Sequence, residues 1–333
     1  MDATRVQTEV FNHIKSSLPA HLALVDVISE TLDLSHDSAY RRIRGEKPVT
    51  LEEIAKLAQK FGFSVDRFLG LESESYIFSG KLANAHDHVF DKWMEETLTQ
   101  YQYMAQSPYT HVYYSAKDLP IHHFYQTPEL ASFKFYFWQK SILQYHELRG
   151  VKYKLGLMEE YSKSLADKII NTYNKVHSSE IWAVETINST LRQIEYYHTA
   201  GIFANKADPG YLCDSLESLI THLELQAEEG VKFPFGKSPV KGNGKYHIYN
   251  NELIVGNNNA IIDMGDVKIT YLNHTSINYI STRDRMFNEY QLSATLNMIN
   301  KSEPLHTVNE KGRISFFNRL RKKIDNCRSK VCG

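Results

Sequence analysis

Apolar residues recur at helical spacing through the first seventy residues. One stripe predicts a helix that stops at Pro19, and the next predicts a helix that ends near Asp33. The positions that make these two stripes are Val10, Phe11, Ile14 and Leu18, followed by Leu24, Val27, Ile28 and Leu32. The chain is therefore expected to open with two short amphipathic helices.

Capping residues predict three more helices in this region. Ser35 stands at an N-cap position, and Gly45 stands where a left-handed residue would close the helix that follows. Residues 50–53, Thr-Leu-Glu-Glu, form a capping box for a helix that ends at Gly62, and Ser64 caps the last segment, SVDRFLG. Short helices joined by tight turns are typical of a helix-turn-helix unit.

The third helix, residues 36–44, is expected to separate its apolar and polar side chains. At about 100° per residue, Ala39 and Ile43 fall together and should face the core. Around them, Asp37, Arg41 and Arg44 lie opposite, with Ser38 and Arg42 on one flank and Tyr40 and His36 on the other. Small apolar residues inward and polar groups outward are what a DNA-recognition helix requires.

A solvated basic face is the alternative for this cluster. Residues 1–70 contain nine lysines and arginines against ten acidic residues, so their net charge does not favour DNA. The cations nevertheless concentrate at positions 41–47, whereas the acids lie mostly on other helices. The pattern therefore favours DNA contact, in which arginine pairs with guanine and aspartate accepts from cytosine.

Residues 22–70 resemble the lambda-repressor/Cro-type (XRE family) helix-turn-helix. The stretch LSHDSAYRRIRGEKPVTLEEIAKLAQKFGFSVDRFLG carries the likeness: recognition helix, glycine, capped fourth helix and short fifth helix. Two departures are Leu24-Val25 in place of Thr-Gln, and Asp33 in place of an interior glycine. The resemblance implies base contacts from His36, Asp37, Tyr40 and Arg41 and backbone contacts from Arg44 and Lys47. The full candidate set is Ser35, His36, Asp37, Ser38, Tyr40, Arg41, Arg42, Arg44 and Lys47.

The remainder reads as a linker and a larger α+β domain. LESESYIFSG, residues 71–80, is polar and lacks strong periodicity. The elements expected after it are a helix ending at Gln106, a strand over 110–116, helices over 128–150, 155–176, 180–200 and 211–229, a β-meander over 245–281, and helices over 283–301 and 309–326. The predicted domains are 1–70, helix-turn-helix; 71–80, linker; and 81–333, an α+β dimerisation or sensor domain divisible into a mainly helical part, 81–230, and a meander with helices, 231–333.

Catalytic and cofactor motifs are near misses. GVKFPFGKS, residues 230–238, has five residues between its glycines where a phosphate-binding loop requires four. A phospholipase-D-like site would need His-x-Lys followed by aspartate, but after His13-Ile14-Lys15 the aspartate position is Ala20. Cys213 is interpreted as a small core residue. We therefore expect no enzyme activity and no cofactor.

The fifteen histidines do not show metal-ligand spacing. His86 and His88 would point to different faces of a helix, and His122 and His123 would diverge if extended. No Cys/His set has the spacing of a zinc site. The sequence therefore predicts no metal.

Aromatic residues concentrate between positions 109 and 145. We predict that a ligand pocket is lined by Tyr113, Tyr114, Phe124, Phe135 and Trp138. A tyrosine-rich core is the alternative, and a protein-interaction platform is another role open to this half. The basic segment 311–330 fits equally well a phosphate contact or a docked helix with a solvated face.

Composition narrows the remaining choices. The net charge is −1, so DNA binding must come from a local patch. Three cysteines form no disulfide framework, and neither a signal peptide nor a long apolar run is visible, so we expect a cytoplasmic protein without membrane contact. The prediction is a homodimeric DNA-binding transcriptional regulator with a possible small-molecule effector. A DNA-targeted nuclease or phosphodiesterase and an interaction scaffold are the alternatives.

Overall fold

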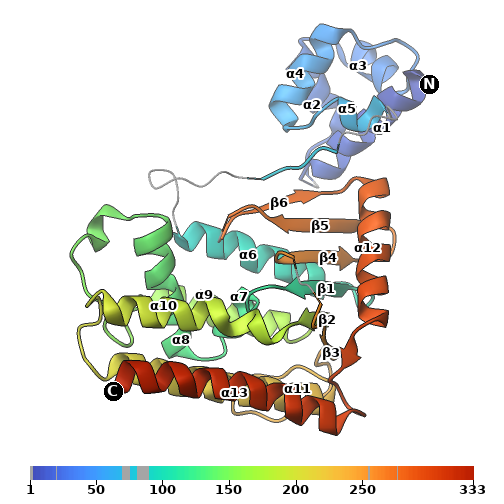
Figure 1. Ribbon diagram of the computed structural model, residues 1–333. Coiled ribbons are helices and arrows are strands. Elements are labelled where there is room, and N and C mark those ends of the chain that lie inside the picture. Colours follow the sequence, from blue (N-terminus) through green and yellow to red (C-terminus); the bar gives the residue numbers. More distant parts are fainter. Residues whose placement is uncertain (1–2, 20, 70–75, 81–89, 254–255, 276) are drawn as a thin grey trace. The chain divides into compact units, whose positions relative to one another are not determined.

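The computed structural model describes residues 3–333 except residues 20, 70–75, 81–89, 254–255 and 276. The chain forms two compact units, Met1–Ile77 and Phe78–Gly333, each described by itself (Figure 1). Within the expected linker, residues 71–75 lie outside the described residues, and residues 78–80 belong to unit 2.

Unit 1 is all-helical in its described residues, as the sequence predicts. Its helices are α1 (Ala3–Ser17), α2 (Leu24–Leu32), α3 (His36–Ile43), α4 (Leu51–Phe61) and α5 (Asp66–Leu69). Their apolar stripes meet in one core that contains Ile14, Ile28, Ala39 and Leu57. Burying these stripes against one another supplies the stability that such short helices lack alone.

The caps of unit 1 follow the sequence signals. Thr50 and Glu53 form the reciprocal capping box of α4, and Gly62 ends that helix with a φ of 65°. Asp33, which stands where the resemblance expects glycine, ends α2 with a φ of 53°. Aspartate tolerates this left-handed conformation better than most residues, so the turn before α3 is kept without glycine.

Unit 2 is built on a seven-stranded sheet with strand order β6-β5-β4-β1-β2-β3-β7. The strands are β1 (His111–Ala116), β2 (His177–Trp182), β3 (Tyr246–Asn250), β4 (Asn259–Asp263), β5 (Lys268–Asn273), β6 (Tyr279–Thr282) and β7 (Glu303–Pro304). The central strands β1, β2 and β3 are parallel, and all other pairings are antiparallel. The fold class is α+β, as predicted.

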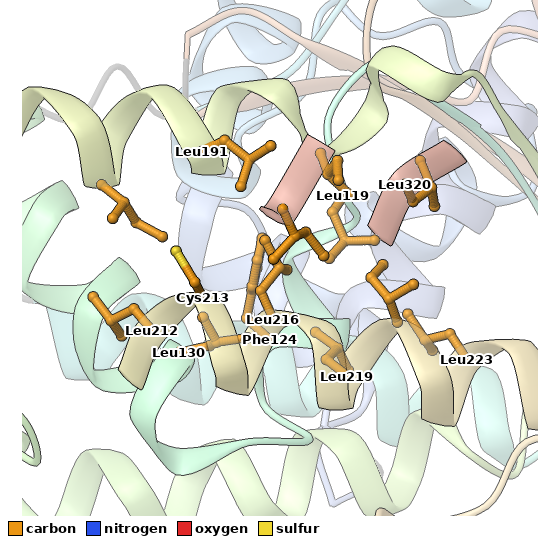
Figure 2. Packing of buried hydrophobic residues seen from close by; sticks show 14 of the residues in the cluster. Leu119, Phe124, Leu130, Leu191, Leu212, Cys213, Leu216, Leu219, Leu223 and Leu320 are labelled. Atoms are coloured by element: carbon orange, nitrogen blue, oxygen red, sulfur yellow. The ribbon is translucent and has the colours of Figure 1, made fainter. Parts of the chain in front are cut away.

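Helices surround this sheet. They are α6 (Phe90–Ala105), α7 (Ile121–Phe124), α8 (Pro128–Phe137), η1 (Trp138–Ile142), η2 (His146–Leu148), α9 (Glu160–Tyr173), η3 (Val184–Ile187), α10 (Asn188–Thr199), α11 (Asp208–Glu229), α12 (Arg285–Asn300) and α13 (Glu310–Cys332). Figure 2 shows Leu212, Leu216 and Leu223 of α11 gathered with Leu191 of α10 and Leu320 of α13. This cluster is the larger core of the unit.

The two faces of the sheet differ in character. Tyr114, Glu180 and Ile248 share one face, because Tyr114 is paired with Glu180 and Glu180 with Ile248. All three are buried. The other face carries His111 and His247, which are half-buried, and α12 packs on the β4–β5 part of the sheet. The polar groups considered below therefore lie under the helices, on the enclosed face.

Three expected elements differ from the structure, one of which is the helix expected over 128–150, which is divided into α8, η1 and η2. Residues 177–182, which the sequence assigns in part to a helix starting at 180, form the central strand β2, and the helix α10 begins at Asn188. Five of the six strand residues are buried, so the run lacks the alternation that marks a half-exposed strand. Of the predicted meander, β4, β5 and β6 pair in succession, whereas β3 pairs with β2. Residues 81–89 of the helix expected to end at Gln106 lie outside the described residues.

Candidate functional site

Helix α3 presents a polar surface to solvent. Ser35 caps the helix by accepting a hydrogen bond from the Ser38 backbone amide at 3.3 Å. Ala39 is fully buried, as the helical wheel predicts, so the opposite side of the helix faces outward. The candidate residues exposed there are Ser35, His36, Asp37, Tyr40, Arg41, Arg44 and Lys47, and Ser38 is half-buried.

Arg42 does not belong to this surface. Its guanidinium is buried and donates to both Glu53 carboxylate oxygens, at 3.0 and 2.6 Å, and to the Ser38 carbonyl at 3.2 Å. A bidentate pair of this kind fixes α3 against the start of α4. Arg42 is therefore a structural residue in this geometry, and the sequence prediction of a DNA contact from it is not supported by its position.

The Glu53 carboxyl acts in two contacts at once. Burial by itself would raise its pKa, but hydrogen bonds from Arg42 and from the Thr50 backbone amide lower the pKa below 4.5. The ionised carboxylate thus completes the capping box and holds Arg42. The wheel could not reveal this pairing, because the partner lies on another helix eleven positions away.

Glu46 lies between the two outward arginines. Its carboxylate is 3.0 Å from Arg44 Nε and 4.0 Å from Arg41 Nε, and all three side chains are about half-exposed. Exposed pairs like these contribute little to stability. These pairs change the local charge instead, because the Glu46 carboxylate offsets part of the positive potential that this surface offers to DNA phosphates.

Gln7 holds the loop between α3 and α4. Its buried side-chain amide donates to the carbonyls of Arg42 and Lys47, at 2.7 and 2.9 Å, and accepts from the Val49 amide at 3.0 Å. These three hydrogen bonds tie α1 to the end of α3 and to the loop that leads to α4. Sequence reasoning missed Gln7, since a single glutamine on an amphipathic helix carries no local signal of this role.

Unit 2 contains a cavity of about 740 Å³ between α6 and the enclosed face of the sheet. Tyrosine side chains from α6, β1, β5 and β6 line it, namely Tyr101, Tyr114, Tyr271 and Tyr279, together with apolar residues, His122 and polar side chains that include Lys92, Glu96 and Gln100. The Tyr114 and Tyr279 hydroxyls lie 3.1 Å apart. Apolar walls with a few polar groups are typical of small-molecule sites of this size.

The predicted pocket residues are dispersed in the structure. Tyr114 lines the cavity, whereas Tyr113 is on the opposite side of β1. Phe124 packs in the larger core, and Phe135 and Trp138 pack in a second one beside Phe90. The lining tyrosines of α6, β5 and β6 lie outside the aromatic segment, so only the sheet topology brings them together.

A second hollow, of about 910 Å³, lies beyond the carboxyl ends of β1 and β2. Charged residues of both signs line it, including Lys117, Asp118, Glu185 and Arg192. In contrast to the tyrosine-lined cavity, it has no buried histidine in its lining. We therefore place the distinctive chemistry of unit 2 at the tyrosine-lined cavity.

A buried polar cluster adjoins that cavity. Glu180 is fully buried on β2, and its carboxylate lies 2.9 and 3.0 Å from His123 Nε2 and 3.7 Å from His122 Nε2. It also accepts from the Tyr173 hydroxyl at 2.7 Å and the Trp182 indole at 2.9 Å. His122 and His123 converge because they lie on the helix α7 rather than on the extended segment assumed from the sequence.

Electrostatics sets the charge state of this cluster. Burial by itself would raise the pKa of Glu180, but its interaction with His123 holds the pKa well below 4.5. Burial beside His123 lowers the pKa of His122 to about 3, so that imidazole is neutral at pH 7. The cluster therefore pairs an ionised carboxylate with at least one neutral imidazole in a water-poor interior.

The basic C-terminal segment forms a docked helix. Phe317, Leu320 and Ile324 of α13 are fully buried. Several cations of the helix pair with acids elsewhere in unit 2: Arg319 with Glu252, Arg321 with Glu224, Arg328 with Asp214 and Glu217, and Lys330 with Glu195. Of the two interpretations, the docked helix describes this geometry, and its paired cations need no phosphate partner.

The capped, tightly connected helices of unit 1, with an exposed polar face on α3, define a helix-turn-helix-like unit. A family model described as the BetR domain, a helix-turn-helix-like regulator domain, matches residues 21–93. This segment runs from before α2 into the start of α6. The finer resemblance to the XRE family stays a prediction. No curated protein and no solved structure matches the chain. In the part of the chain that the structure describes, no helix is both long and apolar enough to cross a membrane.

Proposed function

We propose that the protein is a sequence-specific DNA-binding transcriptional regulator that reads the major groove with α3. The observation that carries the proposal is the exposed surface of α3, where Arg41 and Tyr40 project from a helix fixed by buried Ala39 and Arg42. The match to a regulator-domain family model supports it. In helix-turn-helix proteins the recognition helix lies in the major groove, and side chains on its outward face contact base edges.

In this function the residues have separate roles. Arg41 contacts base edges, as arginine does with guanine, while Arg44 and Lys47 contact phosphates. His36, Asp37 and Tyr40 contribute the remaining specificity. The protein acts as a homodimer whose two α3 helices enter successive major grooves about 34 Å apart. No catalytic step is assigned to either unit.

Selection of random duplex DNA with the purified full-length protein tests this proposal. We expect an enriched palindrome whose affinity falls about tenfold or more in Arg41→Ala, because one good base contact is worth about 1–3 kcal/mol. Glu46→Gln should act in the opposite sense and raise affinity severalfold, since it removes an anion 3.0 Å from Arg44. Both residues are exposed, so folding should be unaffected. Enrichment indifferent to both changes would direct attention to a DNA-targeted enzyme or a scaffold instead.

We further propose that unit 2 senses a small molecule in the tyrosine-lined cavity. The volume of about 740 Å³ and the hydroxyl-bearing apolar walls favour a compact, mainly apolar ligand with a hydrogen-bonding group. Such a ligand alters DNA affinity only if it binds the two states of the dimer differently.

A thermal-shift screen of phenolic and heteroaromatic compounds tests the sensor. A ligand that raises Tm in the wild type should lose its effect in Thr97→Trp, which places a large ring at the cavity wall. Tyr211→Trp, on an exposed position of α11, is the matched control. A ligand that still stabilises Thr97→Trp binds elsewhere, and the cavity would lose the role given to it here.

A further inference from the structure

The side chains of His122, His123 and Glu180 converge on one point. Each offers a ligand atom, and these atoms all lie within 4.8 Å of one another. The Nε2 atoms of the two imidazoles lie 3.7 and 2.9 Å from the nearer carboxylate oxygen. Ligands bound to one Zn²⁺ at about 2.0–2.2 Å are spaced by roughly 3–4 Å, so the separations fit a shared ion.

One of the candidate ligand atoms has no hydrogen-bond partner among the described residues. His122 Nε2 is fully buried and has no hydrogen-bond partner within the described residues, although it faces the carboxylate. Leaving such a nitrogen unpaired in the interior costs free energy. A cation between the imidazole and the carboxylate would supply the missing partner.

The surroundings orient the His122 ring. Its Nδ1 lies 3.0 Å from the Tyr101 hydroxyl. With the proton on Nδ1 and donated to that oxygen, the Nε2 lone pair is directed at Glu180. Metal-bound histidines commonly have their second nitrogen held by an outer partner like this. Because His122 and Tyr101 also line the tyrosine-lined cavity, that cavity provides a route for an ion.

We propose that His122, His123 and Glu180 form a binding site for one divalent transition-metal ion of the zinc type. Two imidazoles and a carboxylate are a ligand set that suits Zn²⁺. The ion would tie α7 to β2 beside the proposed effector cavity. The site does not depend on DNA binding, so its failure would leave the proposed role of α3 unchanged, although His122 and Tyr101 also line that cavity.

Metal content of the full-length protein tests the site. Protein stripped with a chelator and reloaded with Zn²⁺ should retain one ion per chain after gel filtration and show a raised Tm. His122→Gln and Glu180→Gln should bind Zn²⁺ more than about a hundredfold more weakly, and Tyr101→Phe, which removes only the outer partner, roughly tenfold. His247→Gln is the matched control, because this histidine lies on the other face of the sheet beside His306.

X-ray absorption of the Zn²⁺-loaded wild type keeps the test independent of how the variants fold. Two imidazoles with oxygen in the coordination shell are the expected result. A shell with sulfur would assign the ion to Cys213 and Cys327, whose sulfurs lie 3.9 Å apart, and would overturn the proposal. Failure of the wild type to retain Zn²⁺, or loss of binding in His247→Gln alone, would overturn it as well and leave the cluster as a hydrogen-bonded network.

Discussion

Arg42→Ala should destabilise unit 1 by about 3 kcal/mol, because it removes a buried guanidinium and leaves the partly buried Glu53 carboxylate with only its bond from the Thr50 amide. The lost contacts are the two hydrogen bonds to Glu53 and the one to the Ser38 carbonyl. Amide hydrogen exchange of α3 and α4 in the full-length protein measures the effect. We expect protection there to fall about a hundredfold, since each 1.4 kcal/mol is a factor of ten.

The neighbouring arginine is the control for this prediction. Arg44→Ala alters an exposed side chain and should change exchange in α3 by less than about 0.5 kcal/mol. Arg42→Lys should lie between the two, since lysine keeps the charge but not the forked geometry. The three tryptophans, Trp93, Trp138 and Trp182, all lie in unit 2, so their fluorescence should be unchanged. If α3 and α4 were equally protected from hydrogen exchange in Arg42→Ala and Arg44→Ala, the Arg42–Glu53 pair would have no structural role.

Acid should weaken the same contact. The pKa of Glu53 in the folded protein is lowered below 4.5, so its stabilising contribution is complete above pH 4.5 and is lost as the pH falls through the lower folded value. The arginine pair and the capping box are lost together, because both use this carboxylate.

Unit 1 could be predicted closely because its signals are local. Ala39 faces the core as the 3.6-residue period requires, and Thr50 with Glu53 caps α4 as the four-residue motif requires. Arg42 is the informative exception. The helical wheel places it on the flank of the outward face, and only the position of α4 shows that its guanidinium is buried.

For unit 2, the sequence predicts the α+β fold class but not which side chains meet in the candidate site. Its strand β2 is enclosed on both faces, so the polar/apolar alternation that identifies strands is missing from HSSEIW. The sequence pattern therefore places Glu180 in a helix. It gives no link to His123, which lies 57 positions earlier in the chain. Parallel pairing of β1 and β2 places the carboxylate under α7, and no sequence spacing encodes that proximity.

Lys134 is another residue whose surroundings the sequence does not indicate. It interrupts the apolar run ASFKFYFW and is nevertheless buried within it. Its ammonium donates to Gln193 at 2.7 Å and Thr190 at 3.3 Å and lies 4.5 Å from the centre of the Phe124 ring. Burial lowers its pKa from 10.5 to about 7, against a smaller opposing effect of Asp118. The folded protein therefore releases this proton at a lower pH than the unfolded chain.

Stability should consequently rise between pH 7 and pH 9. In that window the unfolded lysine stays protonated while the folded one is losing its proton, so Lys134 adds about 2 kcal/mol to the free energy of unfolding. The contribution is largest above pH 10.5 and is lost as the pH falls through about 7. Lys232, whose pKa burial likewise lowers to about 7, should add a similar amount.

Urea unfolding followed by tryptophan fluorescence at pH 7, 8 and 9 measures this rise. Lys134→Met should remove about half of the rise in unfolding free energy that Lys134 and Lys232 contribute together. Lys152→Met, at an exposed position, should leave that rise unchanged. The buried tyrosines have pKa values raised above 10 and the affected histidines have pKa values lowered below 6.5, so in the folded protein neither class titrates in the window. A rise of equal size in Lys134→Met would show that the Lys134 side chain reaches water and carries no buried charge.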